Sequence, residues 1–205
     1  MFNFLRKKPK QTIPTGIDPK HLRIFVAART AIFDWPQKGT MLFAEFTKYG
    51  EQGQQQARFE VAAYLLHSIS LWCQVGNGSR NPECSKLASA FFNLLQQQDW
   101  FGALCTQREL GTLLSDRDHV YFEAYKDGEA ERALQLLTAI VSYALKGDKG
   151  LTLFHDGKPF DAKEVVVESI ADRVHIGPMI EGIEMPTFFL GINQLISDTL
   201  RKSYM

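Results

Sequence analysis

The chain has 205 residues, of which 45% are hydrophobic and 22% are charged. This length can bury one sizeable core, and this composition excludes wholesale disorder. The formal net charge is zero, so no field of the whole molecule recruits nucleic acid, and little charge repulsion opposes a homo-oligomer. The three cysteines show no C-x-x-C spacing, which argues against a disulfide framework or a zinc knuckle and predicts free thiols in a reducing compartment.

The first ten residues combine apolar and basic side chains and contain no acid. Four of the 23 basic residues lie there, which leaves 19 basic against 23 acidic residues in the rest of the chain. Such an N-terminus can rest on an anionic membrane surface or an acidic partner, where each nearby cation contributes about 1 kcal/mol. The alternative is a mobile tail that its lysines keep soluble. We assign residues 1–17 to a mobile basic tail, whose candidate contact residues are Phe2, Phe4, Leu5, Arg6, Lys7 and Lys8.

Residues 18 to 126 carry successive helix signals. Asp18-Pro19 and Asn81-Pro82 each place a capping residue before a proline, which is typical of the first turn of a helix. Apolar residues at three- and four-residue steps continue these segments. Around residue 115, a run of serine and aspartate predicts a further helix start. The expected helices cover residues 18–35, 54–74, 81–98 and 115–126. Residues 40–49 fit either a helix or a strand, and their apolar residues favour a short helix.

The last third of the chain mixes helical and extended signals. Asp156-Gly157 between two apolar segments predicts a short β-hairpin over residues 151–160. A broad apolar stripe predicts the helix that precedes it, and a capping box predicts the helix that follows it. Two glycines and two prolines in residues 176–190 indicate a loop with one strand. The helices expected here cover residues 129–146, 161–174 and 193–202.

A glycine-rich turn at residues 76–82 is a candidate anion site. Ser79 and Arg80 lie in this turn, just before a predicted helix, and backbone N–H groups at a helix start can hold phosphate or sulfate. No Walker lysine follows the turn, and no βαβ unit surrounds it. A plain connection between two helices uses the same glycines and is the favoured interpretation.

The segment Phe154-His155-Asp156-Gly157-Lys158-Pro159 is similar to the Leu-His-Asp-x-Gly-Lys segment of the HD-domain phosphohydrolases. This resemblance implies an all-helical fold in which His155 and Asp156 bind a divalent metal. It covers six residues and lacks the residue between Asp156 and Gly157. The family also uses an upstream histidine and a downstream aspartate, for which His119 and either Asp172 or Asp198 are present. A tight hairpin turn is the favoured alternative.

Other reactive residues lie in predicted helices. Cys84 lies near a helix start, where the helix dipole is expected to lower the pKa of its thiol. His67 lies beside apolar residues in the middle of a helix, which predicts a hydrogen-bonded histidine in or beside the core. Few basic residues accompany the aromatic residues between Trp100 and Tyr125, so we expect these rings in the core and no nucleic-acid binding.

These observations predict a single, mainly helical domain at residues 18–205, with six to eight helices and a small β element after residue 150. No cofactor is expected. The basic residues of the tail follow the apolar ones, unlike a signal peptide, and we expect a cytoplasmic protein, at most in weak contact with a membrane. The favoured function is a non-enzymatic adaptor, regulatory or inhibitor-type protein that binds a protein partner through a helical surface. The alternatives are a metal-dependent hydrolase using His155 and Asp156, and a small-ligand or anion-binding protein.

Overall fold

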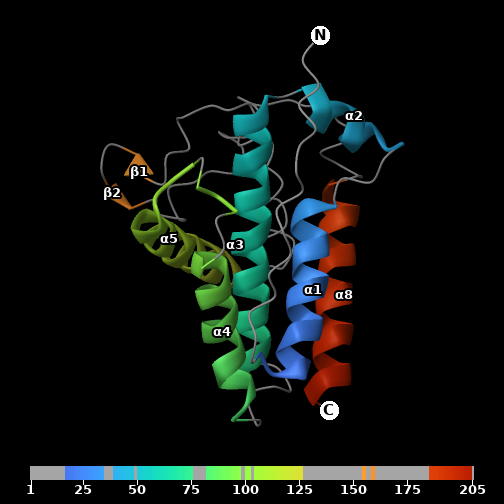
Figure 1. Cartoon of the computed structure of the whole chain (residues 1–205), viewed down its shortest axis with the longest axis vertical. Helices are drawn as coiled ribbons and strands as arrows, with labels where there is room; N and C mark the ends of the chain where they lie inside the picture. The colour runs from blue at the N-terminus through green and yellow to red at the C-terminus, as the bar shows by residue number, and fades with distance from the viewer. Residues whose placement is uncertain are drawn as a thin grey trace.

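The structure is a computed structural model, and it is mainly helical over the residues that it describes (Figure 1). The described residues are 17–34, 39–48, 50–75, 82–97, 100–102, 104–126, 154–155, 158–159 and 185–204. They contain six helices: α1 (Pro19–Phe33), α2 (Met41–Lys48), α3 (Glu51–Val75), α4 (Cys84–Gln97), α5 (Gln107–Lys126) and α8 (Met185–Tyr204). The helices predicted at residues 129–146 and 161–174 lie outside the described residues.

Two short strands occur in the described part of the last third. β1 (Phe154–His155) and β2 (Lys158–Pro159) pair antiparallel, with Phe154 opposite Pro159 and His155 opposite Lys158. The turn between them and the residues on either side are outside the described residues. The hairpin expected over residues 151–160 therefore stays a prediction.

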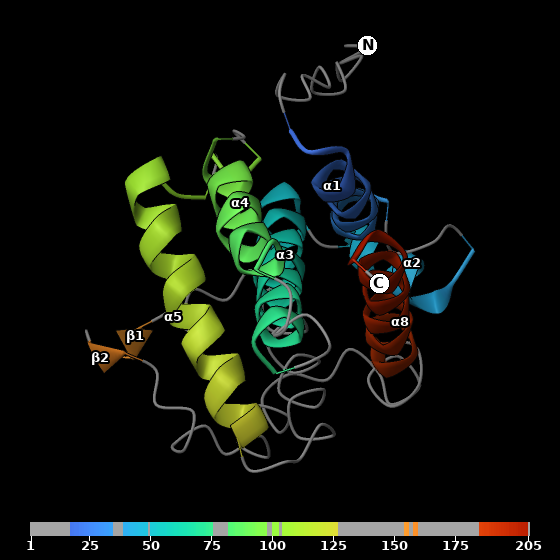
Figure 2. The same cartoon turned by 90° about the horizontal axis from the view of Figure 1, so that it is seen from below.

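Helix α3 is the centre of the arrangement. It packs against α1, α4, α5 and α8, and Figures 1 and 2 show α4 and α5 on one side of it with α1 and α8 on the other. Helices α1 and α8 pack closely against each other. They run antiparallel, because Lys20 and His21 near the start of α1 both lie against the ring of Tyr204 at the end of α8.

The start of α1 is as the sequence predicts. The side chain of Asp18 accepts a hydrogen bond from the backbone N–H of Lys20 at 2.8 Å, and Pro19 occupies the first turn. This cap satisfies one of the N–H groups that a helix start leaves without an intrahelical partner. Helix α4 begins later than expected, at Cys84, because Pro82 and Glu83 form a turn before it.

Helix α5 begins eight residues before the predicted start at residue 115. The cause is a capping box: Thr106 Oγ1 accepts from the Glu109 backbone N–H, while the Glu109 carboxylate accepts from the Thr106 backbone N–H at 2.8 Å. Gly111 does not interrupt this helix. A Cβ atom there would lie 2.5 Å from Gln96 Nε2, so the glycine leaves room for the Gln96 side chain of α4.

Helix α8 also begins earlier than predicted. The sequence indicated a loop through residue 190, yet the helix already starts at Met185. Pro186 fits because a proline in the first turn removes an N–H that has no intrahelical partner there. Phe189, Ile192, Ile196 and Leu200 are buried at three- and four-residue steps, so burial of this apolar stripe outweighs the low helix propensity of Gly191. None of the described helices is long and apolar enough to cross a membrane.

The middle of α3 is buried on all sides. Three apolar residues here are fully buried: Val61, Leu65 and Ile69. Two polar residues are almost fully buried, because Glu60 is 5% exposed and His67 is 3% exposed. Polar groups removed from water cost free energy unless they find hydrogen-bond partners. The polar residues of α3 must therefore be satisfied by neighbouring helices, and those contacts define the candidate site.

Candidate functional site

One face of α3 carries polar side chains into the interior. Glu60, Tyr64, His67 and Ser68 follow the i, i+4, i+7, i+8 spacing that places residues on the same side of a helix. They meet polar residues of α5 and α8. We call this set the polar layer, and its members are Glu60, Tyr64, His67, Ser68, Arg117, Asp118, Tyr121 and Asn193.

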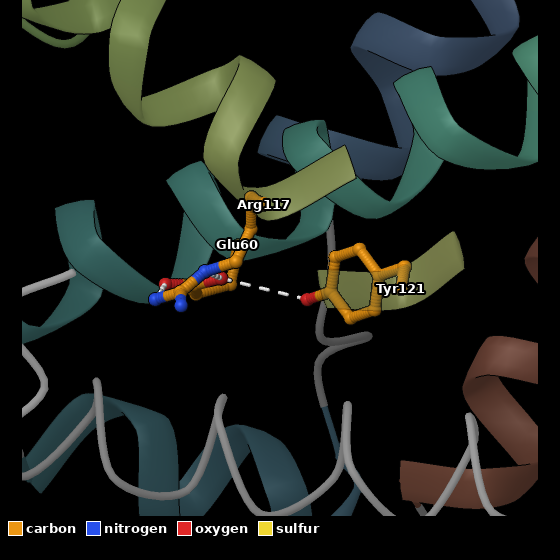
Figure 3. Close-up of polar contacts among 3 residues, drawn as sticks. All are labelled: Glu60, Arg117 and Tyr121. Atoms are coloured by element: carbon orange, nitrogen blue, oxygen red, sulfur yellow. Dashed lines mark hydrogen bonds and ion pairs between the residues drawn. The ribbon is translucent and has the colours of Figure 1, made fainter. Parts of the chain in front are cut away.

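A buried ion pair joins α3 to α5 (Figure 3). Arg117 Nε donates to Glu60 Oε2 at 2.8 Å, and Arg117 Nη2 donates to Glu60 Oε1 at 2.5 Å. The two side chains are only 1% and 6% exposed. Burial lowers the pKa of Arg117, but the charge and hydrogen bonds of Glu60 raise this pKa by more, so the guanidinium stays protonated. The two parallel hydrogen bonds fix the orientation of both side chains.

Tyr121 completes this contact from one turn further along α5. Its hydroxyl donates to Glu60 Oε2 at 3.5 Å (Figure 3), and its side chain is fully buried. Burial raises the pKa of Tyr121 well above its ordinary value, and the Glu60 carboxylate raises it further, while Arg117 lowers it. The phenol is therefore neutral at physiological pH and acts as a hydrogen-bond donor.

His67 and Asp118 form a second polar contact between the same helices. His67 Nδ1 lies 3.0 Å from Asp118 Oδ1, and the His67 ring packs 5.7 Å from the Tyr121 ring. The His67 side chain is 4% exposed, whereas that of Asp118 is 40% exposed. The expectation of a hydrogen-bonded histidine in or beside the core is confirmed. The pair forms the outer edge of the polar layer, where solvent reaches the carboxylate.

Asn193 links α8 to the polar layer. Asn193 Nδ2 donates to the Tyr64 hydroxyl at 2.6 Å, and Asn193 Oδ1 accepts from the Ser68 hydroxyl at 3.3 Å. The Tyr64 ring contacts Tyr121 edge-on at 5.5 Å and Phe189 of α8 at 6.0 Å. One side chain of α3 therefore connects α5 and α8.

The chemistry of this arrangement is that of paired charges and oriented hydrogen bonds. Arg117 holds its charge against Glu60, Tyr121 stays neutral, and His67 is paired with a carboxylate. Among the described residues, no group of three or more His, Cys, Asp and Glu side chains is placed to bind a metal ion. The polar layer can thus fix the positions of α3, α5 and α8, because each contact is satisfied in one register of the helices.

Most candidate residues of the sequence lie outside the described residues: Phe2, Phe4, Leu5, Arg6, Lys7, Lys8, Ser79, Arg80 and Asp156. His155 belongs to β1. His119 is exposed on α5, and Asp198 of α8 accepts a hydrogen bond from Gln194 at 2.9 Å. The tail contact, the anion site and the metal site therefore stay predictions.

Two expectations about single residues are wrong. The pKa of the Cys84 thiol is raised, because burial outweighs the opposing effects of Cys73 and of the charge of Lys20. Among the aromatic residues expected in the core, Phe101 and Tyr121 are buried, but Phe122 is 43% exposed. Phe122 follows directly after the buried Tyr121, so the rotation of the helix turns it away from α3.

The polar layer itself was not found from the sequence. Its signal was present in α3, where Glu60, Tyr64, His67 and Ser68 share one face of the helix. The partners of these residues lie more than 50 positions away in the chain, as with Glu60 and Arg117. No local pattern pairs residues at that distance.

Comparison of the chain with models of protein families, with curated proteins and with solved structures found no match. The described residues form a bundle of helices around a central buried helix, with a polar layer along one face of that helix.

Proposed function

We propose that this protein is a helical interaction module of the adaptor, regulatory or inhibitor type, which binds a protein partner through α8. The observation that carries the proposal is the apolar surface in the middle of this helix, where Leu190 is 58% exposed and Leu195 is 44% exposed. Gly191 and Gln194 between them are exposed as well. We call these four residues the outer face of α8.

The geometry of a helix places the two leucines on the flanks of this face. They are five residues apart, which corresponds to about 140° around the helix axis. Gly191 and Gln194 lie between them, opposite the buried Ile192 and Ile196. A segment of a partner laid along α8 would bury both leucines at once, in the manner of a helix docked into an apolar groove.

Gly191 supports this interpretation. A glycine inside a helix costs about 1 kcal/mol relative to alanine. A Cβ atom at Gly191 would meet nothing within 4 Å, and the residue has no positive φ. Packing within the chain therefore does not account for the glycine, whereas a partner backbone could use the missing side chain to approach α8 closely.

The polar layer contributes by positioning α8. Asn193 faces α3 and is hydrogen-bonded to Tyr64 and Ser68, while its neighbours Gln194 and Leu195 point outward. A docking surface held in one orientation loses less conformational freedom when a partner binds. The polar contacts of the layer fix the orientation of the helices, and the apolar outer face provides the contact area.

Site-specific photo-cross-linking in the cells that produce the protein tests this proposal. A photoreactive amino acid is placed at residue 190 or 195 and, as a control, at the exposed Thr112 and Ser115 of α5. We expect a discrete protein adduct from the two α8 positions and none from α5. An adduct with twice the mass of the chain would identify the partner as a second copy. Equal adducts from both helices would contradict the proposal.

Gly191→Ala separates folding from binding in the same experiment. The substitution is expected to raise the melting temperature, because alanine favours the helix and the space around Gly191 is open. It is also expected to reduce the adduct formed from residue 195, since the new methyl group keeps the partner from the helix. An unchanged adduct yield would exclude a role for Gly191 in docking.

A further inference from the structure

Positive charge gathers at the lower end of the molecule in Figure 1, where the starts of α1 and α4 meet the ends of α3 and α8. Lys20 of α1 forms an ion pair with Glu83, the residue before α4, at 2.8 Å. The Lys20 ammonium group also lies 5.6 Å from the centre of the Tyr204 ring of α8. The ring of Trp72, in the last turn of α3, lies 6.4 Å from the Tyr204 ring. These contacts place the four helix ends side by side.

Four more cations lie within the first or last five residues of these helices. All four residues are exposed, and none of them forms an ion pair with another described residue. The last five residues of α3 carry no charge. We call these four cations the basic end, and they are Arg23 of α1, Lys86 of α4, and Arg201 and Lys202 of α8.

The carboxylates near the described helix ends do not neutralise the basic end. Asp18 accepts a hydrogen bond from the backbone N–H of Lys20 at 2.8 Å, and Glu83 is paired with the Lys20 ammonium group. Asp198, the next carboxylate along α8, accepts a hydrogen bond from Gln194 at 2.9 Å. Lys20 and the basic end together are five cations, beside two carboxylates at the helix starts. This end therefore carries an excess of positive charge, although the formal net charge of the chain is zero.

The N-terminal tail joins the bundle at the same end, because α1 begins there at Pro19. The first ten residues of the tail contain four basic residues, the apolar Phe2, Phe4 and Leu5, and no acid. One weak membrane signal gives only marginal and reversible binding, and stable attachment takes two signals. The tail is predicted to be one signal, and the basic end supplies a second where the tail is attached.

We propose that the basic end is a docking surface for an anionic lipid bilayer, with the ends of α1, α4 and α8 facing the headgroups. The apolar residues of the tail favour a bilayer over an acidic protein, because such side chains enter the boundary between headgroups and acyl chains. Anionic headgroups attract the exposed cations over about 10 Å at 0.1 M salt. The outer face of α8 lies further along the bundle, so it stays accessible to a protein partner in this orientation.

Sedimentation of the full chain with lipid vesicles tests the proposal. We expect the chain to sediment with vesicles of phosphatidylcholine and phosphatidylserine, less so as the salt concentration rises, and not with phosphatidylcholine alone. Each cation near such a surface strengthens binding about fivefold. Replacing the whole basic end by glutamine should therefore weaken binding by more than about tenfold, with the tail left intact. The four substitutions are Arg23→Gln, Lys86→Gln, Arg201→Gln and Lys202→Gln.

Two single variants form a matched pair of controls. Arg201→Gln removes one exposed cation of the basic end, and Arg108→Gln removes one exposed cation near the start of α5, which lies away from this end in Figure 1. Both should melt at the wild-type temperature, because glutamine and arginine have similar helix propensities. Only Arg201→Gln should weaken binding, by up to about fivefold.

Three results would overturn the proposal. The first is a variant without the basic end that binds anionic vesicles as tightly as the wild type, which would leave any membrane contact to the tail alone. The second is an equal loss of binding in Arg108→Gln, which would mean that only the total charge matters. The third is a wild-type chain that sediments with neither kind of vesicle, which would exclude a bilayer and leave an acidic protein as the candidate partner of this surface.

Discussion

The two sides of α3 are stabilised in different ways. The polar face of α3 carries the polar layer, which contacts α5 and α8, while other positions of the helix carry buried apolar residues such as Leu65 and Ile69. Burial of apolar area is non-directional and tolerates side chains of similar size. A buried ion pair requires both partners in one geometry, since either partner alone is a buried, uncompensated charge. The apolar positions therefore stabilise the bundle without fixing its orientation, and the polar layer selects one arrangement of the helices.

The largest effect is expected from breaking the ion pair. Arg117→Met leaves the carboxylate of Glu60 in the core without its cation, which should lower the free energy of unfolding by about 3–5 kcal/mol. Urea unfolding followed by circular dichroism measures the loss. The double variant Glu60→Met/Arg117→Met is the control, and it should recover most of the stability because no charge is left in the core. A single variant as stable as the wild type would show that the pair is not buried in solution.

A smaller effect is expected where α8 joins the polar layer. Asn193→Ala removes the donor to the Tyr64 hydroxyl and the acceptor of the Ser68 hydroxyl, and the loss of two hydrogen bonds should cost about 1–3 kcal/mol. Amide hydrogen exchange should show the largest loss of protection in α8. Uniform loss of protection through all helices would mean that Asn193 supports the whole bundle and not α8 in particular.

The apolar side should tolerate a conservative change. Ile69→Val removes one methylene group from a fully buried side chain, and such a change costs about 0.5–1.5 kcal/mol. Thermal or urea unfolding of this variant beside Arg117→Met compares the two sides of α3 directly. A loss as large as that of the broken ion pair would refute the distinction drawn between them.

The smallest effect at neutral pH is expected for Tyr121→Phe, because its hydrogen bond to Glu60 is long, at 3.5 Å. The difference in stability between the wild type and this variant should appear at alkaline pH. The pKa of Tyr121 is raised in the folded protein from its ordinary value of 10.0, so above this pH the unfolded chain releases a proton that the folded chain keeps. The wild type should then lose up to about 1.4 kcal/mol more stability per pH unit than the variant. Equal slopes would show that the phenol ionises without unfolding.

Local signals located the helices well where capping and periodicity agreed. Asp18-Pro19 marked the start of α1, and the apolar spacing around residues 54–74 marked α3. The errors occurred where one local signal was given too much weight. Pro186 and Gly191 are weak helix formers, and their presence led to a predicted loop where the first turns of α8 lie. The serine and aspartates near residue 115 indicated a helix start there, whereas the cap of α5 is Thr106.

The sequence alone predicts that the part of the chain which the structure describes is mainly helical and that His67 is a hydrogen-bonded histidine at the core, because apolar periodicity is a property of short segments. Only the tertiary structure decided which polar residues meet. Glu60 and Arg117, and Tyr64 and Asn193, are brought together by the packing of different helices. Such contacts depend on the rotation and register of whole helices, and these follow from the burial of every apolar face at once.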